Sequence, residues 1–280
     1  MTRKRNAALG LLVVCLLALA PAGGASAAKP GGTTSTAPSS MSALGDSITK
    51  AFNACGWFFD CTERSWASGT YSGVNSHYLR ILAKNNRISG RNYNDAVSGA
   101  KIADLPGQAT NAANRGVEYV TILMGANDAC TSSEANMTPV ETYRSHFTTA
   151  MQTLATRLPN AKFSVVSVPD IQRLWFIGKD SSSARNAWSA YGICQSMLAN
   201  PQSTDPVDVD RRARVRQRVI DFNTVLASVC AQYANCRFDN NAAFNYPFLL
   251  SHMSTWDYFH PNTEGQRVLA DVSYRNTWNF

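Results

Sequence analysis

From Met41 onward, short apolar segments alternate with longer stretches of helical periodicity. The predicted strands are 41–44, 93–96, 119–124, 163–168 and 237–238, and the predicted helices are 76–83, 108–116, 138–157, 208–233 and 263–276. Strands that alternate with helices favour a parallel sheet covered by helices on both faces. Ligands of such sheets bind at the carboxyl ends of the strands. The alternation therefore predicts an α/β fold and the edge at which a site should lie.

The first 27 residues have the three-part pattern of a secretory signal peptide. Three basic residues at positions 3–5 precede an apolar run over 7–20, and the small residues Ala25-Ser26-Ala27 follow it. The apolar run is shorter than the stretch of about 20 residues that a membrane-spanning helix needs. We therefore expect that residues 1–27 are removed and that the remaining protein is secreted to the extracellular space.

Residues 28–40 are rich in Gly, Pro, Ser and Thr, and we expect them to form a flexible lead-in. Residues 41–280 are predicted to form one domain, because a chain of this length can bury a sizeable core. Removing 1–27 leaves 23 basic residues against 19 acidic ones, a formal charge of +4. This mild excess could attract an anionic surface, and it does not indicate nucleic acid.

Six cysteines follow the predicted signal peptide: Cys55, Cys61, Cys130, Cys194, Cys230 and Cys236. An even number of cysteines in an exported chain favours disulfides. The two pairs that are close in sequence predict Cys55–Cys61 and Cys230–Cys236, which leaves Cys130–Cys194. A zinc site is the alternative interpretation, but the CxxC spacing that such sites usually have is absent. We therefore expect three disulfides and no metal.

Polar residues follow two of the predicted strands. Gly45-Asp46-Ser47 comes directly after the first strand, which places Ser47 on a turn at the predicted ligand-binding edge. Gly125-Ala126-Asn127-Asp128 comes after the third strand, and its asparagine can direct amide donors towards a ligand at the same edge. Each segment alone is also ordinary chemistry for a turn or a helix start. Asp46 is interpreted as a turn residue beside the serine.

Near the C-terminus, Asp257 precedes His260 by three residues. A turn can bring the two side chains within hydrogen-bond reach, and the carboxylate then orients the imidazole and stabilises its cationic form. The other histidines have no comparable partner in the sequence and are interpreted as structural; they are His77, His146 and His252.

Together these segments resemble the four sequence blocks of the GDSL, or SGNH, hydrolase family. The blocks are Gly45-Asp46-Ser47, an isolated Gly99, Gly125-Ala126-Asn127-Asp128, and Asp257-x-x-His260. They come in the order of the family, and the resemblance spans residues 41 to about 270. The first block continues with Ile48 where the family has Leu, a conservative change. The exported form with six cysteines is similar to the secreted actinobacterial lipases and phospholipases of that family.

The resemblance implies a three-layer α/β/α sandwich around a five-stranded parallel sheet, the flavodoxin-like SGNH hydrolase fold. It also implies a serine ester hydrolase in which Ser47 is the nucleophile, His260 the general base and Asp257 the residue that orients the histidine. The backbone N–H groups of Ser47 and Gly99 and the side-chain amide of Asn127 would form the oxyanion hole. No metal or organic cofactor is implied.

Two aromatic clusters lie close to the predicted site: Trp57, Phe58 and Phe59 within the 55–61 loop, and Trp175 and Phe176 after the fourth strand. Such clusters suit an acyl-chain pocket or a lipid surface, and they could equally belong to the core. With the mild positive charge they favour lipid acyl esters as substrate, in the manner of a phospholipase A1 or B or a lipase. The five arginines of 211–218 are interpreted as a solvated helix face.

Other readings of the substrate stay open, because a fold does not decide its substrate. Short-chain or aryl esters come second, and acetyl groups on a polysaccharide come third. A lipid- or glycan-binding module without turnover is the non-enzymatic alternative, which the presence of Ser47, Asn127 and His260 disfavours. We expect the protein to be a monomer. Its partner is expected to be a small-molecule or lipid ester substrate, and a lipid substrate would be bound at a membrane or micelle surface.

Overall fold

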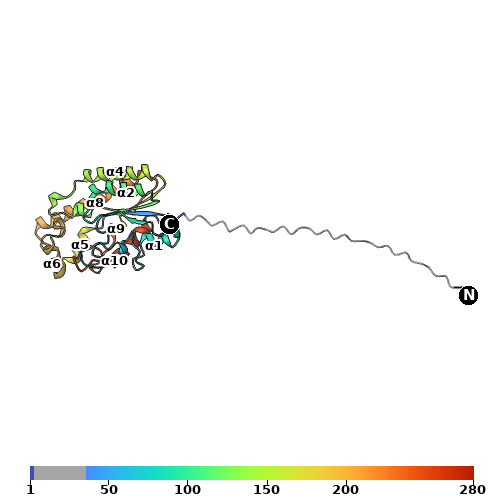
Figure 1. Ribbon diagram of the computed structural model, residues 1–280. Helices are drawn as coiled ribbons and strands as arrows, with labels where there is room; N and C mark the ends of the chain where they lie inside the picture. The colour runs from blue at the N-terminus through green and yellow to red at the C-terminus, as the bar shows by residue number, and fades with distance from the viewer. Residues whose placement is uncertain (3–35) are drawn as a thin grey trace. The chain divides into compact units, whose positions relative to one another are not determined.

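The computed structural model describes residues 1–2 and 36–280 (Figure 1). By its internal contacts the chain divides into a unit Met1–Thr34 and a unit Ser35–Phe280, and the second is described here. The predicted signal peptide, residues 1–27, lies outside the described residues except for its first two, and so does most of the predicted lead-in, residues 28–40.

Five strands form one parallel sheet in the order β2-β1-β3-β4-β5. They are β1 (Met41–Gly45), β2 (Asn92–Asn94), β3 (Tyr119–Leu123), β4 (Lys162–Val165) and β5 (Cys236–Phe238). Every residue of β1 and β3 is buried, as expected for the central strands of a sheet that is covered on both faces. The predicted α/β fold with a five-stranded parallel sheet is confirmed.

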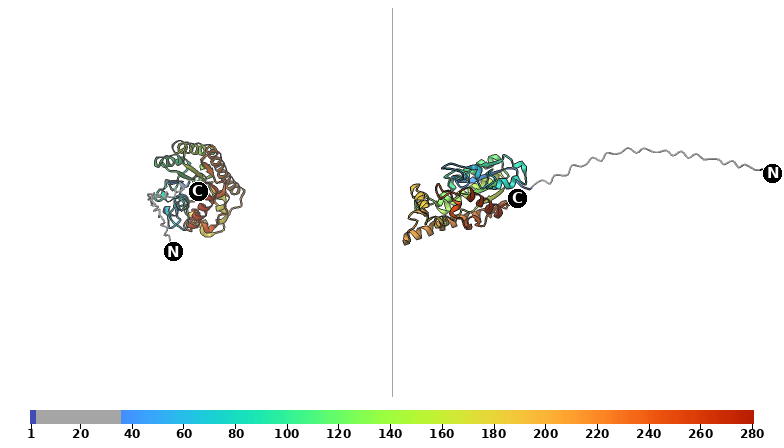
Figure 2. Two further views of the ribbon diagram at one scale, coloured as in Figure 1. Left: turned by 90° about the vertical axis from the view of Figure 1, so that its right-hand side faces the viewer. Right: turned by 90° about the horizontal axis from the view of Figure 1, so that it is seen from below.

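Helices cover both faces of the sheet. Those of the described residues are α1 (His77–Leu82), α2 (Leu105–Arg115), α3 (Ala126–Ala129), α4 (Val140–Arg157), α5 (Ile171–Gly178), α6 (Ser182–Ala190), α7 (Gln195–Leu198), α8 (Pro206–Cys230), α9 (Ala242–Asn245) and α10 (Thr263–Asn276). Helices α2, α4 and α8 lie on one side of the sheet and α1, α5, α9 and α10 on the other, which gives three layers (Figures 1 and 2). None of the helices within the described part of the chain is long and apolar enough to cross a membrane.

The strand order places a topological switch point between β1 and β3. The chain leaves β1 towards β2 on one side and returns to β3 on the other, so the carboxyl ends of β1 and β3 border a crevice. The segments after these two strands are those that hold Ser47 and Asn127. The topology therefore brings the first and third sequence blocks together at one edge.

The folded domain begins before the predicted boundary at Met41. The backbone N–H and the hydroxyl of Ser39 donate to the Glu118 carboxylate at 2.6 and 2.8 Å, and Asn85 Nδ2 donates to the Ala37 carbonyl at 2.7 Å. The prediction of a flexible lead-in up to residue 40 is therefore wrong for its last residues. Polar, proline-containing sequence is fixed here by hydrogen bonds to distant partners.

The arginines of α8 connect this helix to neighbouring segments, so the prediction of a solvated face is wrong for most of them. Arg211 donates to the carbonyl of Ala199 at 2.7 Å, beside α7, and Arg216 pairs with Asp170 at 2.8 Å. Arg212 is only 2% exposed, and its guanidinium lies 4.6 Å from the ring centre of Trp175. Carbonyl, carboxylate and aromatic groups are thus the partners of these three charges.

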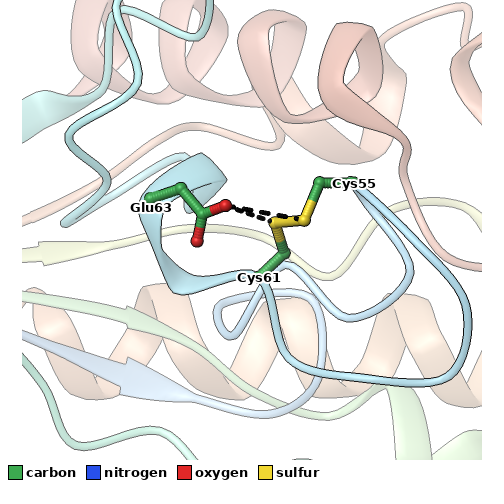
Figure 3. Close-up of side chains that lie close together, drawn as sticks. All are labelled: Cys55, Cys61 and Glu63. Atoms are coloured by element: carbon green, nitrogen blue, oxygen red, sulfur yellow. Dashed lines mark hydrogen bonds between the residues drawn. A yellow bond between two sulfur atoms is a disulfide. The ribbon is translucent and has the colours of Figure 1, made fainter.

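Residues 36–280 contain three disulfides, and they join the pairs that the cysteine spacing predicts: Cys55–Cys61, Cys130–Cys194 and Cys230–Cys236. Figure 3 shows the Glu63 carboxylate beside the first of them, 2.9 Å from Cys61 Sγ. Both sulfurs are used in the disulfide, so this cluster offers an ion only the carboxylate of Glu63. Three such bonds are consistent with an oxidising compartment.

Candidate active site

Gly45 ends β1 and allows the chain to turn towards Ser47. Its φ of +150° is unfavourable for other residues, and a Cβ there would overlap the carbonyl oxygen of Leu123 on the neighbouring strand. Gln108 of α2 holds the same residue with two hydrogen bonds, to the Gly45 N–H at 2.8 Å and to its carbonyl at 2.9 Å. The end of β1 is therefore fixed on both sides before the chain reaches Ser47.

The hydroxyl of Ser47 lies at one end of a chain of hydrogen bonds. His260 Nε2 is 2.8 Å from Ser47 Oγ, and His260 Nδ1 is 2.6 Å from Asp257 Oδ2. The three side chains come from the turn after β1 and from the segment before α10, which are more than 200 residues apart along the chain. An imidazole that is placed in this way can take the proton of the serine hydroxyl while the carboxylate stabilises the resulting cation.

The turn that holds Asp257 and His260 is fixed by its own backbone. Asp257 Oδ1 accepts the backbone N–H groups of Phe259 at 2.9 Å and His260 at 3.1 Å. Tyr258, the residue after Asp257, has a left-handed φ of 52°. Burial by itself would raise the pKa of Asp257, but the hydrogen bond and charge of His260 and these N–H groups hold its pKa below the usual range. Asp257 therefore stays ionised beside the histidine.

Asp46 is buried next to Ser47 and has a structural part in the turn after β1. Its Oδ1 accepts the backbone N–H of Ile48 at 2.9 Å, while Oδ2 has no hydrogen-bond partner among residues 36–280. Burial raises the pKa of Asp46 to about 7. The hydrogen bond to Ile48 agrees with the interpretation of Asp46 as a turn residue.

Gly99 and Asn127 are brought to the same edge by contacts around β1. The N–H of Val97 donates to the Gly45 carbonyl at 3.1 Å, and Asn127 Nδ2 donates to the Ala100 carbonyl at 3.0 Å. Gly99 has a φ of +84°, with open space where a Cβ would stand. Over residues 36–280, no hydrogen bond uses the backbone N–H of Ser47 or Gly99. Two unused N–H groups and a nearby amide are the donors that an oxyanion hole requires.

An apolar cavity lies beside these residues. Its walls include Ile48, Ala126 and Phe259, which are the neighbours in sequence of Ser47, Asn127 and His260. Helix α5 contributes Leu174 and Ile177 to the lining of the cavity, and the charged residues of that lining are Asp170 and Arg173. The lining of the cavity is mostly apolar.

The five aromatic residues predicted to line an acyl pocket are absent from this cavity's walls within the described chain. Trp57, Phe58 and Phe59 lie exposed on the 55–61 loop, called here the aromatic loop, and Trp57 is 64% exposed. On α5, Trp175 packs against α8 and Phe176 is 56% exposed, while the residues on either side of the pair face the cavity. These five side chains therefore do not line this cavity, and of the alternatives that the sequence left open a role at a lipid surface stays a prediction.

The aromatic loop lies close to His260. The ring of Phe52 is 5.0 Å from that of His260 and 6.1 Å from that of Phe58. Further ring contacts extend the cluster to two residues that the sequence did not indicate, Trp256, which stacks on Trp57, and Tyr191, which contacts Phe58. A continuous aromatic surface thus runs from the histidine to solvent.

Two further residues of the site could not be expected from the sequence. Gln108 holds Gly45, as described above, and Asn53 donates to Asp257 Oδ2 at 2.7 Å. Neither belongs to a recognisable motif. Gln108 lies within a predicted helix, and the only signal for its role would have been a polar residue on the helix face that packs against the sheet. Asn53 lies in a stretch without periodicity.

The chain is similar to known proteins in sequence and in fold. The sequence model of the GDSL-like Lipase/Acylhydrolase family matches residues 41–272. A putative GDSL-like lipase from Parabacteroides merdae has a TM-score of 0.52 at 16% identity, covering 85% of this chain and 94% of its own. No curated protein is similar enough in sequence to count as a match.

Two other solved structures have TM-scores of 0.49. Phospholipase A1 from Streptomyces albidoflavus is 16% identical, with 85% of this chain and 99% of that chain covered. A family 3 carbohydrate esterase from Clostridium thermocellum is 14% identical, with 86% and 95% covered. At these identities the likeness concerns the fold.

Proposed function

The chain belongs to the GDSL-like lipase/acylhydrolase family, whose activity is ester hydrolysis, and we propose that it hydrolyses carboxylic esters by a serine mechanism. The hydrogen-bond chain from Ser47 through His260 to Asp257 is the observation that carries this proposal. Ser47 Oγ attacks the ester carbonyl while His260 Nε2 takes its proton. The imidazolium then gives that proton to the leaving alcohol, and an acyl-serine remains. Water deprotonated by His260 releases the acid and restores the serine.

The charge that develops on the ester oxygen needs donors that are already in place. The unused N–H groups of Ser47 and Gly99 and the amide of Asn127 supply them in this proposal. Gly99 suits the task because no side chain stands between its N–H and the reacting carbonyl.

We propose lipid acyl esters as the substrate class, with the acyl chain bound in the apolar cavity. The cavity and the exposed aromatic loop support this choice, since a chain of acetyl length would need neither. A phospholipid would be cleaved at its carboxyl esters, because a serine, a histidine and an oxyanion hole are arranged for acyl transfer. The protein is proposed to be secreted, with which its three disulfides are consistent.

Filling the cavity should shorten the acyl chains that the enzyme accepts. Each buried methylene contributes about 0.8 kcal/mol, so four of them give a preference of about 10²-fold. Ile177→Trp should therefore lower kcat/KM for a decanoyl ester by about 10²-fold and leave acetyl ester hydrolysis within about threefold. The measurement is a series of p-nitrophenyl esters from two to twelve carbons.

Phe176→Trp is the matched control, because it adds a similar side chain on the exposed face of the same helix. It should leave the chain-length profile unchanged. If acetate esters are the fastest substrates of the unaltered enzyme and no fatty acid is released from phospholipid, the short-chain or acetyl esterase interpretation takes its place.

The aromatic loop should increase activity on lipid that is packed in a surface. Tryptophan and phenylalanine side chains enter the boundary between headgroups and acyl chains, and each contributes about 1.5–3 kcal/mol when buried. Trp57→Ser with Phe59→Ser should weaken binding to phosphatidylcholine vesicles by about 10²-fold. Hydrolysis of a soluble butyryl ester should change little. Sedimentation of vesicles and fatty acid release measure the two effects.

Val207→Ser is the control for this experiment, since it removes an exposed apolar side chain on α8. Equal losses of vesicle and soluble-ester activity in the loop variant would contradict the surface role and indicate damage to the site itself.

A further inference from the structure

Asn53 joins two parts of the molecule that are distant in sequence. Its side chain is 2% exposed, and Nδ2 donates to Asp257 Oδ2 at 2.7 Å. At the other end of the same amide, Oδ1 accepts the backbone N–H of Phe58 in the aromatic loop at 2.6 Å. The backbone N–H of Asn53 also donates to the Phe59 carbonyl at 3.1 Å. One buried amide thus bridges the aromatic loop and the Asp257 carboxylate.

The bond to Asp257 falls on the oxygen that faces the histidine. Oδ2 receives both His260 Nδ1 and Asn53 Nδ2, while Oδ1 receives two backbone N–H groups of its own turn. Four donors therefore fix the plane of the carboxylate. A neutral donor on Oδ2 also draws charge from the atom that stabilises the imidazolium.

The backbone at Asn53 is held in an uncommon conformation. Its φ is +60°, in the left-handed region that asparagine tolerates better than most residues. The aromatic loop behind it is closed by the Cys55–Cys61 disulfide and by a bridge between Phe52 and Asp60. The direction of the Asn53 side chain is thus set by a constrained turn and a cross-linked loop.

We propose that Asn53 is a positioning residue for ester hydrolysis, which holds the Asp257 carboxylate towards His260 and ties it to the aromatic loop. The inference rests on the proposed serine mechanism. It places the surface proposed to meet lipid two hydrogen bonds away from the carboxylate that orients the catalytic base.

Two substitutions separate the bonds of Asn53. Asn53→Asp keeps the acceptor for the Phe58 N–H but replaces the donor to Asp257 by a second carboxylate. Asn53→Gly removes both side-chain bonds and accepts the left-handed backbone without strain. Asn75→Gly is the matched control, because Asn75 also has a left-handed φ, of 51°, and its side chain is exposed.

Both Asn53 variants should lower kcat on a soluble p-nitrophenyl ester about 10- to 100-fold with KM within about threefold, because orientation acts on the chemical step. The acid limb of kcat/KM against pH should move upwards by about one pH unit in Asn53→Asp, since a second carboxylate stabilises the imidazolium. Asp46 also acts on His260 electrostatically and is unchanged in both variants. Asn75→Gly should match the unaltered enzyme in kcat and pH profile.

An acid limb that does not move in Asn53→Asp, or a kcat within twofold of normal, would overturn the inference. A fall in melting temperature with unchanged kcat and pH profile would assign Asn53 a purely structural role and overturn it as well. Ser47→Ala, measured in the same assays, distinguishes a failure of the proposed serine mechanism from a failure of the inference about Asn53. If Ser47→Ala stays active, the serine mechanism fails and takes the inference with it, whereas an inactive Ser47→Ala with normal Asn53 variants overturns the inference alone.

Discussion

Ser47→Ala is expected to lower kcat/KM for carboxylic esters by about 10⁴-fold or more, and His260→Ala by a similar factor. The first change removes the atom that would form the acyl intermediate, and the second removes the group that takes its proton across 2.8 Å. Because the two side chains act as one unit, the double variant should be hardly worse than either single one. Steady-state hydrolysis of a soluble ester, with melting temperatures, measures the effect.

Ser251→Ala and His146→Ala are the matched controls, since neither side chain takes part in the hydrogen-bond chain of Ser47, His260 and Asp257, and they should keep full activity. A serine-directed organophosphonate should label the unaltered enzyme at Ser47 and leave Ser47→Ala unlabelled. Activity within tenfold of normal in either active-site variant would remove the assigned role. Labelling elsewhere in the chain would point to a different nucleophile.

The longer helices could be predicted because each repeats an apolar pattern over many residues, and the strands because they are short apolar segments between those helices. All five strands were found, and α10 coincides with the predicted range 263–276. The segment 171–198 was missed, although it contains α5, α6 and α7. These helices have four to nine residues, too few for a periodic pattern to stand out, and tertiary contacts such as the buried Trp188 hold them.

The candidate site divides in a similar way. Asp257 and His260 are three residues apart, so a single turn brings them together, and the resemblance to a family paired them with Ser47. Asn53 reaches Asp257 from 204 residues away, and no spacing encodes such a contact. Its left-handed backbone, and the two hydrogen bonds that its side-chain amide makes to Asp257 and Phe58, appear only when the chain is folded.

The aromatic residues show a different limit of the sequence. Apolar character predicts burial on average, yet Trp57 is exposed while Leu174 and Ile177 line the cavity. Residues 174–177 form one turn of α5, so consecutive side chains point in different directions. An apolar cluster in the sequence therefore identifies a segment beside the cavity, but it does not show which of its side chains line the cavity.

Asn127→Ala is expected to lower kcat by about 10²- to 10³-fold with little change in KM, because an oxyanion donor acts only when charge has developed on the ester oxygen. Asn136→Ala, an exposed asparagine shortly after α3, is the control and should behave normally. Asn127→Asp should be at least as damaging, since it places an acceptor and a negative charge where the oxyanion would form. Kinetics on a soluble ester at a pH above the acid limb measure all three.

The result also shows whether Asn127 acts as an oxyanion donor or only holds the loop of Gly99 through its hydrogen bond to the Ala100 carbonyl. One N–H of the amide is used in that bond at 3.0 Å, which leaves the second for the substrate. If kcat of Asn127→Ala stays within tenfold and the melting temperature falls, the amide serves only to hold the loop of Gly99. The oxyanion hole would then consist of the two backbone N–H groups, and Gly99, whose φ of +84° disfavours a side chain, would be the residue on which it depends.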